Sequence, residues 1–265
     1  MTTDILSKIV KQKEQEISKA RCILSEKKLA ALAADRSDFR PFFDVLKEPD
    51  AGGVNLIAEV KRASPSKGDI CADLNAPIAA AAFEKGGASA VSVLTDFCFF
   101  KGSLEDLKAA RAACSLPVMR KEFIVSRYQV YEACVAGADA ILLIARILTP
   151  DKLAQLYDLC RKLRMDALVE IHTFEEARRV ADSDVRLIGI NNRNLSTFET
   201  DIDIAMELAS QLAPGQVPVA ASGISRPEDI RKNLDAGIFN FLVGESIVRS
   251  GNSVQFIQAL RAAGK

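Results

Sequence analysis

The sequence predicts a (β/α)8 TIM barrel preceded by an N-terminal helical extension. From Val54 onward, short apolar runs typical of buried strands alternate with amphipathic helical stretches, and they do so eight times. Several helical stretches end in Gly just before the next run, in the repeated phrases GGASAVSVL, AGADAILLI and AGIFNFLV. Eight such units between residue 54 and residue 265 fit one closed parallel barrel.

Residues 1–46 form the predicted extension. Apolar residues recur there at helical spacing among many Lys and Glu residues, at Ile5, Leu6, Ile9, Val10, Ile17, Ile23 and Leu24. Pro41 predicts the start of a short helix. The apolar stripe of the extension either caps something beneath it or contacts a partner protein, and the sequence leaves both open.

The barrel is expected over residues 54–265, and residues 1–265 are expected to form a single domain. The predicted strands span residues 54–60, 89–94, 117–121, 139–144, 166–171, 186–191, 217–221 and 238–243. The predicted helices span residues 75–86, 102–113, 126–136, 149–163, 173–182, 201–212, 226–235 and 251–263. An open doubly wound sheet would usually carry GxGxxG after its first strand, whereas this loop reads ASPSKG.

Charge and composition exclude several classes of function. Lys plus Arg and Asp plus Glu both number 35, so the chain offers no basic field for nucleic acid or for an anionic membrane. No apolar run has the length of a membrane span, and early lysines interrupt any signal-peptide core. The six cysteines form no CxxC or metal-type cluster, which predicts reduced thiols, no metal site and a cytoplasmic protein. The single histidine, His172, is expected to have a passive role.

Two charged residues emerge from the apolar start of the first predicted strand, in VNLIAEVKRASPSKG. Ile57, Glu59 and Lys61 share one face, because side chains two apart in a strand point the same way. Burying a charge is costly unless it is paired or used. Glu59 and Lys61 are therefore either a structural ion pair at a strand end or an acid and a cation at the mouth of an active site.

Polar side chains also stand at the ends of later strands. Lys121 ends the third strand, Glu170 lies near the end of the fifth and Asn191 ends the sixth, with Arg193 close behind. Active sites of these barrels lie at the C-terminal ends of the strands. Each residue alone has an ordinary solvent or turn role, but their convergence on one barrel mouth predicts a functional site.

The last two βα loops predict a phosphate site. Ser222 and Gly223 follow the seventh strand, and Gly244 and Glu245 follow the eighth, which is the usual phosphate position in these barrels. Glycine lets backbone N–H groups approach phosphate oxygens closely. The loop after the second strand carries Phe97 and Phe100, which either pack on the core or form an aromatic wall for a planar substrate.

The chain resembles the indole-3-glycerol-phosphate synthase family nearly from end to end. The resemblance rests on the ordered set ILSKIVKQKEQEI, EVKRASPSKG, LTD…FFKGS, RKEFIV, LVEIH, GINNRN, SGI and VGES. It implies a barrel lyase of tryptophan biosynthesis that needs no metal or organic cofactor. Such an enzyme closes the indole ring of 1-(2-carboxyphenylamino)-1-deoxyribulose 5-phosphate and releases carbon dioxide and water.

The resemblance also implies roles for the candidate residues. Lys121 would be the general acid and Glu170 the general base, with Lys61 contacting the substrate carboxylate or phosphate and sharing the acid role. The supporting residues would be Glu59 and Asn191 for orientation, Ser64 and Arg193 for substrate support, Ser222, Gly223, Gly244 and the backbone of Glu245 for phosphate, and Phe97, Phe100 and Leu142 for the aromatic ring.

One residue departs from the pattern of the family. The seventh strand of the family normally ends in Glu-Ser-Gly-Ile, whereas this chain has Ala221 before Ser222. The alternatives are a slower synthase, a compensated site, or a related phosphate-binding barrel with changed or lost activity. A sugar-phosphate isomerase or aldolase, a non-catalytic binding protein and a multienzyme subunit that docks through residues 1–46 are the further alternatives to a monomeric synthase acting on a small molecule.

Overall fold

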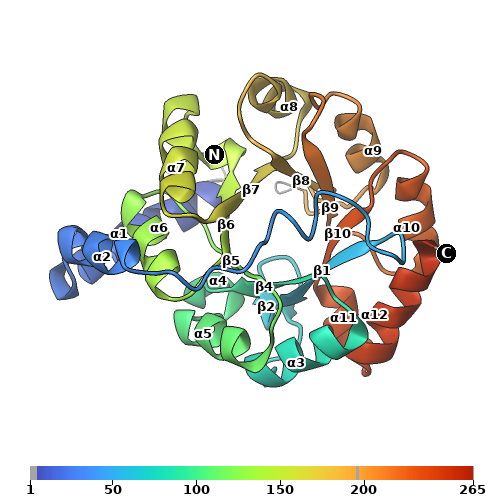
Figure 1. Cartoon of the computed structure of the whole chain (residues 1–265), viewed down its shortest axis with the longest axis horizontal. Helices are drawn as coiled ribbons and strands as arrows, with labels where there is room; N and C mark the ends of the chain where they lie inside the picture. Colours follow the sequence, from blue (N-terminus) through green and yellow to red (C-terminus); the bar gives the residue numbers. More distant parts are fainter. Residues whose placement is uncertain (1–4, 195–196, 265) are drawn as a thin grey trace.

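The computed structural model describes residues 5–194 and 197–264 and shows a closed barrel of parallel strands (Figure 1). The strand order around the barrel is β1-β10-β9-β8-β7-β6-β5-β4, and every neighbouring pair is parallel. The barrel strands are β1 (Asn55–Val60), β4 (Ala90–Leu94), β5 (Val118–Lys121), β6 (Ala140–Ile144), β7 (Asp166–Ile171), β8 (Leu187–Asn191), β9 (Val217–Ala221) and β10 (Asn240–Val243). The predicted barrel is therefore confirmed.

Helices surround the barrel and precede it. The extension holds α1 (Ile5–Ile23) and α2 (Glu26–Ala34). The outer ring holds α3 (Ala76–Gly86), α5 (Leu104–Ala113), α6 (Arg127–Val135), α7 (Pro150–Lys162), α8 (Phe174–Ala181), α9 (Asp203–Ala209), α10 (Pro227–Leu234) and α12 (Ser253–Arg261). The short elements are α4 (Phe97–Phe100), α11 (Glu245–Arg249), the 3-10 helices η1 (Ala145–Ile147) and η2 (Ala262–Gly264), and a small hairpin of β2 (Ala63–Ser64) and β3 (Gly68–Asp69).

The prediction of a helix starting at Pro41 is wrong. The segment that joins α2 to β1 crosses one end of the barrel as a series of turns (Figure 1). Phe42 and Leu46 are fully buried and pack with the side chains inside the barrel. The backbone N–H of Phe43 donates to Asp166 at the start of β7 at 2.8 Å, which holds the segment across the opening. Tertiary packing of a plug thus overrides the local helical pattern.

Arginine side chains fasten the same segment to the barrel. Asp139, just before β6, is fully buried and accepts from Arg36 at 2.9 Å and from Arg111 at 2.5 Å. The Asp139 carboxylate also accepts from the backbone N–H of Arg40 at 2.9 Å. Several donors therefore satisfy this buried carboxylate and lock this end of the barrel.

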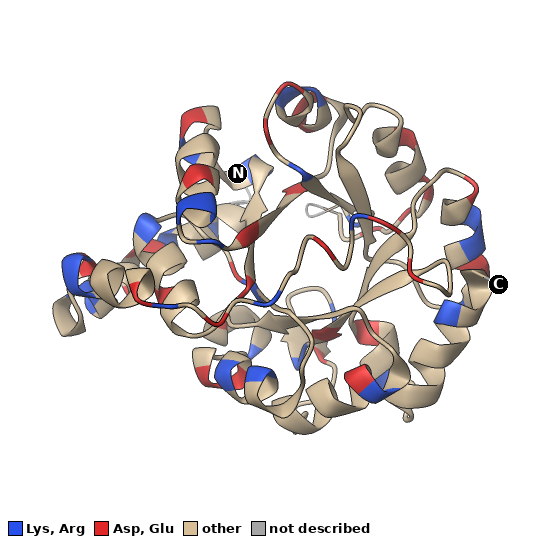
Figure 2. Ribbon diagram, in the orientation of Figure 1, with Lys and Arg blue, Asp and Glu red and all other residues tan. Residues whose placement is uncertain are grey.

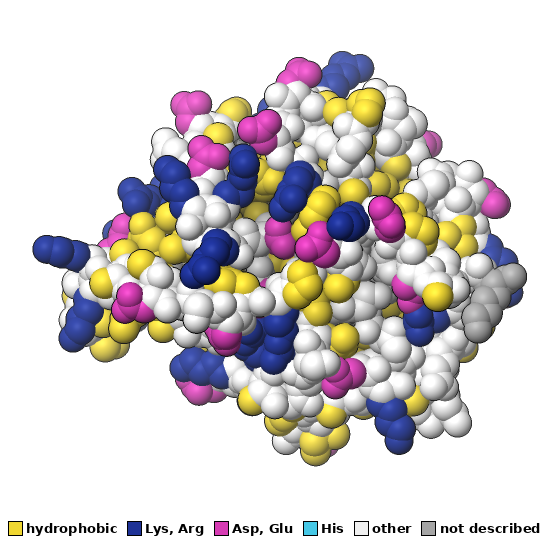
Figure 3. All heavy atoms as spheres, viewed as in Figure 1, with side chains coloured by type: hydrophobic (Ala, Val, Ile, Leu, Met, Phe, Trp, Pro, Cys, Tyr) yellow, Lys and Arg dark blue, Asp and Glu magenta, His cyan; other side chains and the backbone are white. Residues whose placement is uncertain are grey.

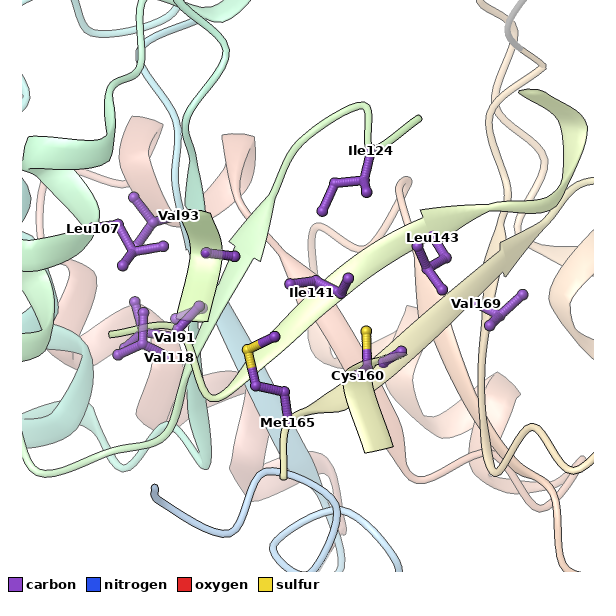
Figure 4. Close-up of a cluster of buried hydrophobic side chains, with 14 of the residues drawn as sticks. Val91, Val93, Leu107, Val118, Ile124, Ile141, Leu143, Cys160, Met165 and Val169 are labelled. Carbon is purple, nitrogen blue, oxygen red and sulfur yellow. The ribbon is translucent and has the colours of Figure 1, made fainter. Parts of the chain in front are cut away.

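Two apolar layers result from the alternation of side chains along the strands. Ile57, Met119 and Leu168 point into the barrel and belong to an inner cluster with Phe42. Side chains of the opposite strand faces pack beneath the helices, as Figure 4 shows for Val91, Val118, Ile141, Leu143 and Val169 with Leu107 of α5 and Cys160 of α7. The inner cluster fills the barrel below the C-terminal ends of the strands. The charged side chains at these ends therefore lie above a packed apolar layer.

The surface carries charges of both signs. Figure 2 shows Lys, Arg, Asp and Glu distributed over the outer helices without a face of one sign. Figure 3 shows the plugged end covered by side chains, with charged and apolar groups intermixed. Among the described helices, none is both long and apolar enough to cross a membrane.

A buried lysine attaches α1 to the opposite, C-terminal end of the barrel. Lys13 is 2% exposed and lies 2.6 Å from Asp96 and 3.2 Å from Glu122. Asp96 caps α4, and Glu122 directly follows the end of β5. Burial opposes the charge of Lys13, but the two carboxylates raise its pKa, so the ammonium group stays charged.

We predict that Lys13→Met destabilises the protein by about 3 to 5 kcal/mol, because it leaves the buried Asp96 carboxylate without its cation and Glu122 with Arg120 alone, at 3.7 Å. Chemical unfolding of the variant measures the loss. Lys11→Met, at an exposed position of the same helix, is the control and leaves the free energy of unfolding nearly unchanged. Equal stability of the two variants would contradict the role of Lys13 as an anchor.

Candidate active site

A cavity of about 300 Å³ opens at the C-terminal ends of the strands, under the first turns of α1. Residues from all eight barrel strands line the cavity, Leu94 from β4 among them, together with loops that follow the strands. Ile5, Leu6 and Ile9 of α1 form an apolar part of its wall. The extension therefore covers the mouth of the barrel, which is one of the two roles that its apolar stripe left open.

Lys121 and Glu59 form a partly buried ion pair inside this cavity. The Lys121 Nζ atom donates to Glu59 Oε2 at 3.1 Å, and the Ser92 hydroxyl donates to the same oxygen at 3.1 Å. Burial opposes the charge of Lys121, but Glu59 and Glu170 raise its pKa. A β-carbon at Gly244 would lie 2.9 Å from Glu59 Oε1, so the glycine leaves room for this carboxylate.

Lys61 has a different environment. Its ammonium group lies 5.7 Å from the centre of the Phe100 ring and makes no ion pair within 4 Å among the described residues. Burial lowers its pKa, Glu59 opposes the shift, and Lys121 and Arg193 add to it. Lys61 is therefore a desolvated cation that is available for an anionic ligand.

Glu170 of β7 accepts one hydrogen bond and makes one contact with a histidine. Its Oε1 atom accepts from Asn191 Nδ2 at 3.2 Å and lies 3.3 Å from His172 Nε2. Burial would raise the pKa of this carboxyl, but His172, Lys121 and Asn191 together lower it to about 2. Glu170 is therefore ionised at neutral pH.

Arg193 ties two loops together at the cavity wall. Its Nη1 atom donates to the Ser66 hydroxyl at 2.5 Å, and its Nη2 atom lies 3.8 Å from the Glu245 carboxylate. Arg249 of α11 approaches the same carboxylate at 3.2 Å. The Ser64 hydroxyl accepts from the backbone N–H of Lys67 at 3.2 Å and so shapes the first loop.

The loops after β9 and β10 both line the cavity and are joined to each other. Ser222 and Gly223 both adopt left-handed conformations, with φ of 68° and 84°. The Ser246 hydroxyl donates to the Ile224 carbonyl at 2.8 Å and joins the two loops. The Glu245 carboxylate at the start of α11 is engaged by Arg193 and Arg249, so its charge is compensated.

All predicted site residues except Phe97 line the cavity. The set is Glu59, Lys61, Ser64, Phe100, Lys121, Leu142, Glu170, Asn191, Arg193, Ser222, Gly223, Gly244 and Glu245. Phe97 lies at the start of α4 with its side chain turned outward, 75% exposed. The short helix points Phe100 rather than Phe97 at the cavity, so the proposed aromatic role of Phe97 loses its support.

Sequence reasoning missed part of the aromatic and apolar wall. Phe123 lines the cavity, and its ring centre lies 5.9 Å from that of Phe100. For Ile5, Leu6 and Ile9 the sequence predicts only a helical stripe, because helical spacing does not specify the surface on which a helix packs. Phe123 shares the face of Lys121 in the strand pattern, and that signal was available.

The described residues contain no group of three or more His, Cys, Asp or Glu side chains that could hold a metal ion. What the cavity does present is cations, an ionised carboxylate and a loop after β9 with two left-handed residues. These features define a barrel enzyme class that acts by acid–base chemistry on an anionic small molecule.

Comparison with known proteins narrows this class. A family model described as indole-3-glycerol phosphate synthase matches residues 6–260. A synthase of that name from Desulfosudis oleivorans is 55% identical over 97% of this chain and 98% of its own length. Another, from Syntrophobacter fumaroxidans, is 48% identical over 93% of each chain. The chain therefore belongs to the indole-3-glycerol phosphate synthase family, and the predicted synthase function in tryptophan biosynthesis is confirmed.

Similarity to solved structures at low sequence identity supports the barrel fold but not a particular activity. A thiamine phosphate pyrophosphorylase from Pyrococcus furiosus superimposes with a TM-score of 0.59 at 13% identity, over 80% of this chain and 96% of the other. The relatives of the same family give no support to the alternative of a barrel with changed or lost activity.

We predict that Glu59→Gln moves the basic limb of the pH profile of turnover to lower pH. The substitution removes a carboxylate that raises the pKa of Lys121, while burial still lowers this pKa. The lysine therefore loses its proton at a lower pH than in the parent protein. Initial rates across the alkaline range measure the shift. Ser92→Ala, which removes only a neutral donor to Glu59, should leave the basic limb in place, and an equal shift in both variants would contradict the prediction.

Proposed function

We propose that the described cavity carries out the decarboxylating, dehydrating ring closure of 1-(2-carboxyphenylamino)-1-deoxyribulose 5-phosphate. The observation that supports this most directly is that Lys121 and Glu170 face the same cavity in opposite charge states. Lys121 protonates the ribulose carbonyl as the ring carbon attacks it, and Glu170 accepts the proton removed in the later dehydration. General acid–base groups of this kind each contribute roughly 10²- to 10⁴-fold to a rate.

Lys61 and the loops orient the substrate in this proposal. Lys61 contacts the substrate carboxylate or phosphate and shares the acid role, because it lines the cavity half-buried, without an ion-pair partner in the described structure. The loops at Ser222–Gly223 and Gly244–Glu245 hold the phosphate through backbone N–H groups. Arg193 and Ser64 support the phosphate end of the substrate through the first loop.

The aromatic ring lies in the apolar part of the cavity. Phe100 and Leu142 contact one side of the ring, and α1 covers it with Ile9. Glu59 and Asn191 keep the reacting lysine and carboxylate in position. The cover also excludes water, which strengthens the electrostatic interactions beneath it.

The proposed function also covers the domain organisation, location, cofactors and partners of the enzyme. Residues 1–46 and 54–265 act as one catalytic domain in the cytoplasm, on a small molecule, without a metal or an organic cofactor. Nucleic acid and membranes are not partners, since the charges of the chain balance. The chain acts as a monomer, and light scattering of the purified protein tests this against a partner that docks on the extension.

Indole fluorescence during incubation with the carboxyphenylamino-deoxyribulose phosphate tests the proposed chemistry. We expect a rise with the parent protein and a rate at least about 100-fold lower with Lys121→Ala, since the general acid is removed. Lys101→Ala, at an exposed lysine outside the cavity, is the matched control and keeps the parent rate. An unchanged rate in Lys121→Ala, or borohydride trapping of substrate on Lys121, would contradict the acid role.

We predict that Ala221→Glu raises kcat/KM by about tenfold, the effect of one added charge-assisted hydrogen bond. Ala221 is 3% exposed and lines the cavity, so the new carboxylate would meet the cations there. Steady-state kinetics measure the change, with Ala221→Gln as an uncharged control of similar size. A loss of activity in Ala221→Glu would show that Ala221 is already compensated.

A further inference from the structure

His172 occupies a buried position between two carboxylates. It follows β7 directly, and its side chain is 4% exposed. Its Nε2 atom lies 3.3 Å from Glu170 Oε1, and its Nδ1 atom lies 3.6 Å from Glu176 Oε2, in the first turn of α8. Its ring nitrogens meet no described acceptor in aligned hydrogen-bond geometry, so these are ion-pair contacts.

This arrangement favours the imidazolium form. A neutral imidazole has one N–H donor and one lone pair, so one of its nitrogens would direct a lone pair at a carboxylate. Only the doubly protonated ring is attracted to both partners. Glu176 is itself fixed, because its Oε2 atom accepts from the backbone N–H of His172 at 2.6 Å.

The described contacts of the Glu170 carboxylate involve one of its two oxygens, Oε1. Asn191 and His172 both approach Oε1, and no described residue donates a hydrogen bond to Oε2. A carboxylate held through one oxygen keeps the other oxygen free for a ligand in the cavity. Glu170 lines the cavity and His172 is not among its described lining residues, so His172 contacts Glu170 from outside the cavity.

We propose that His172 is a positioning residue, whose imidazolium ring holds the Glu170 carboxylate ionised and in one orientation, with Glu176 as the outer counter-ion that keeps the ring charged. The inference deepens the proposed function, since it rests on Glu170 as the general base. His172 does not touch the substrate and transfers no proton in the reaction. This positioning role differs from the passive role that the sequence predicts for His172, the only histidine of the chain.

The charges around the ring agree with this role. Burial lowers the pKa of His172, but Glu170 and Glu176 raise it to about 9. Burial raises the pKa of Glu176, while His172 and Arg179 lower it. From β5, Lys121 faces Glu170 and stabilises the same carboxylate. From β8, Asn191 contributes a neutral donor.

A single histidine makes the test direct, since the chain gives one pair of imidazole signals, from Nδ1 and Nε2, in a nitrogen NMR spectrum. We expect the parent protein to show a doubly protonated ring at pH 7 that titrates near pH 9. Glu176→Gln should lower the pH of this titration, and Glu175→Gln, at the exposed neighbouring position, should leave it unchanged. A neutral ring at pH 7, or the same titration in all three proteins, would overturn the proposal.

Kinetics supply the second readout. His172→Gln removes the imidazolium charge, so the pKa of the buried Glu170 carboxyl rises and the base is protonated at a higher pH. As the pH is lowered from 8 to 5, kcat/KM of the variant should therefore fall by about tenfold more than kcat/KM of the parent. A packing role alone would lower kcat/KM equally at all pH values, and that result would also overturn the proposal. The NMR titration does not depend on turnover, so it separates failure of this inference from failure of the proposed chemistry.

Discussion

The active-site region depends on one constraint, namely that charged side chains at the strand ends must be paired inside a water-poor cavity. The ion pair of Lys121 with Glu59 meets this constraint at 3.1 Å, and the contact of Glu170 with His172 meets it at 3.3 Å. Lys61 lacks such a partner in the described structure, and burial lowers its pKa. The cavity thus combines compensated groups that keep their charge with one cation that a ligand can compensate.

The N-terminal extension completes the cavity at one end of the barrel and plugs the other. Phe42 and Leu46 fill the floor, while Ile5, Leu6 and Ile9 close the mouth over the charged residues. Lys13 links the cover to Asp96 and Glu122, and Glu122 directly follows Lys121. Packing of the extension and the electrostatics of the site are therefore coupled through neighbouring residues at the end of β5.

Much of the fold followed from periodicity, because a strand buried on both faces and a helix buried on one leave different patterns. The same alternation placed Glu59, Lys121 and Glu170 on the inner faces of their strands. What the pattern lacks is long-range information. The plug at Phe42 depends on contacts between distant segments, and residue spacing does not encode such contacts. The short helix that turns Phe97 outward and the approach of Glu176 to His172, four residues apart, are local features that strand and helix periodicity alone does not resolve.

The central claim is that one cavity places the phosphate, the aromatic ring and the reacting carbonyl of the substrate against three different groups of residues. A crystal structure of the Lys121→Ala variant with the carboxyphenylamino-deoxyribulose phosphate bound tests it most directly. The account predicts the phosphate at the backbone of Gly223 and Gly244, the ring beside Phe100 under α1, and the carbonyl facing position 121. A phosphate bound elsewhere, or a ring outside the cover formed by α1, would contradict it.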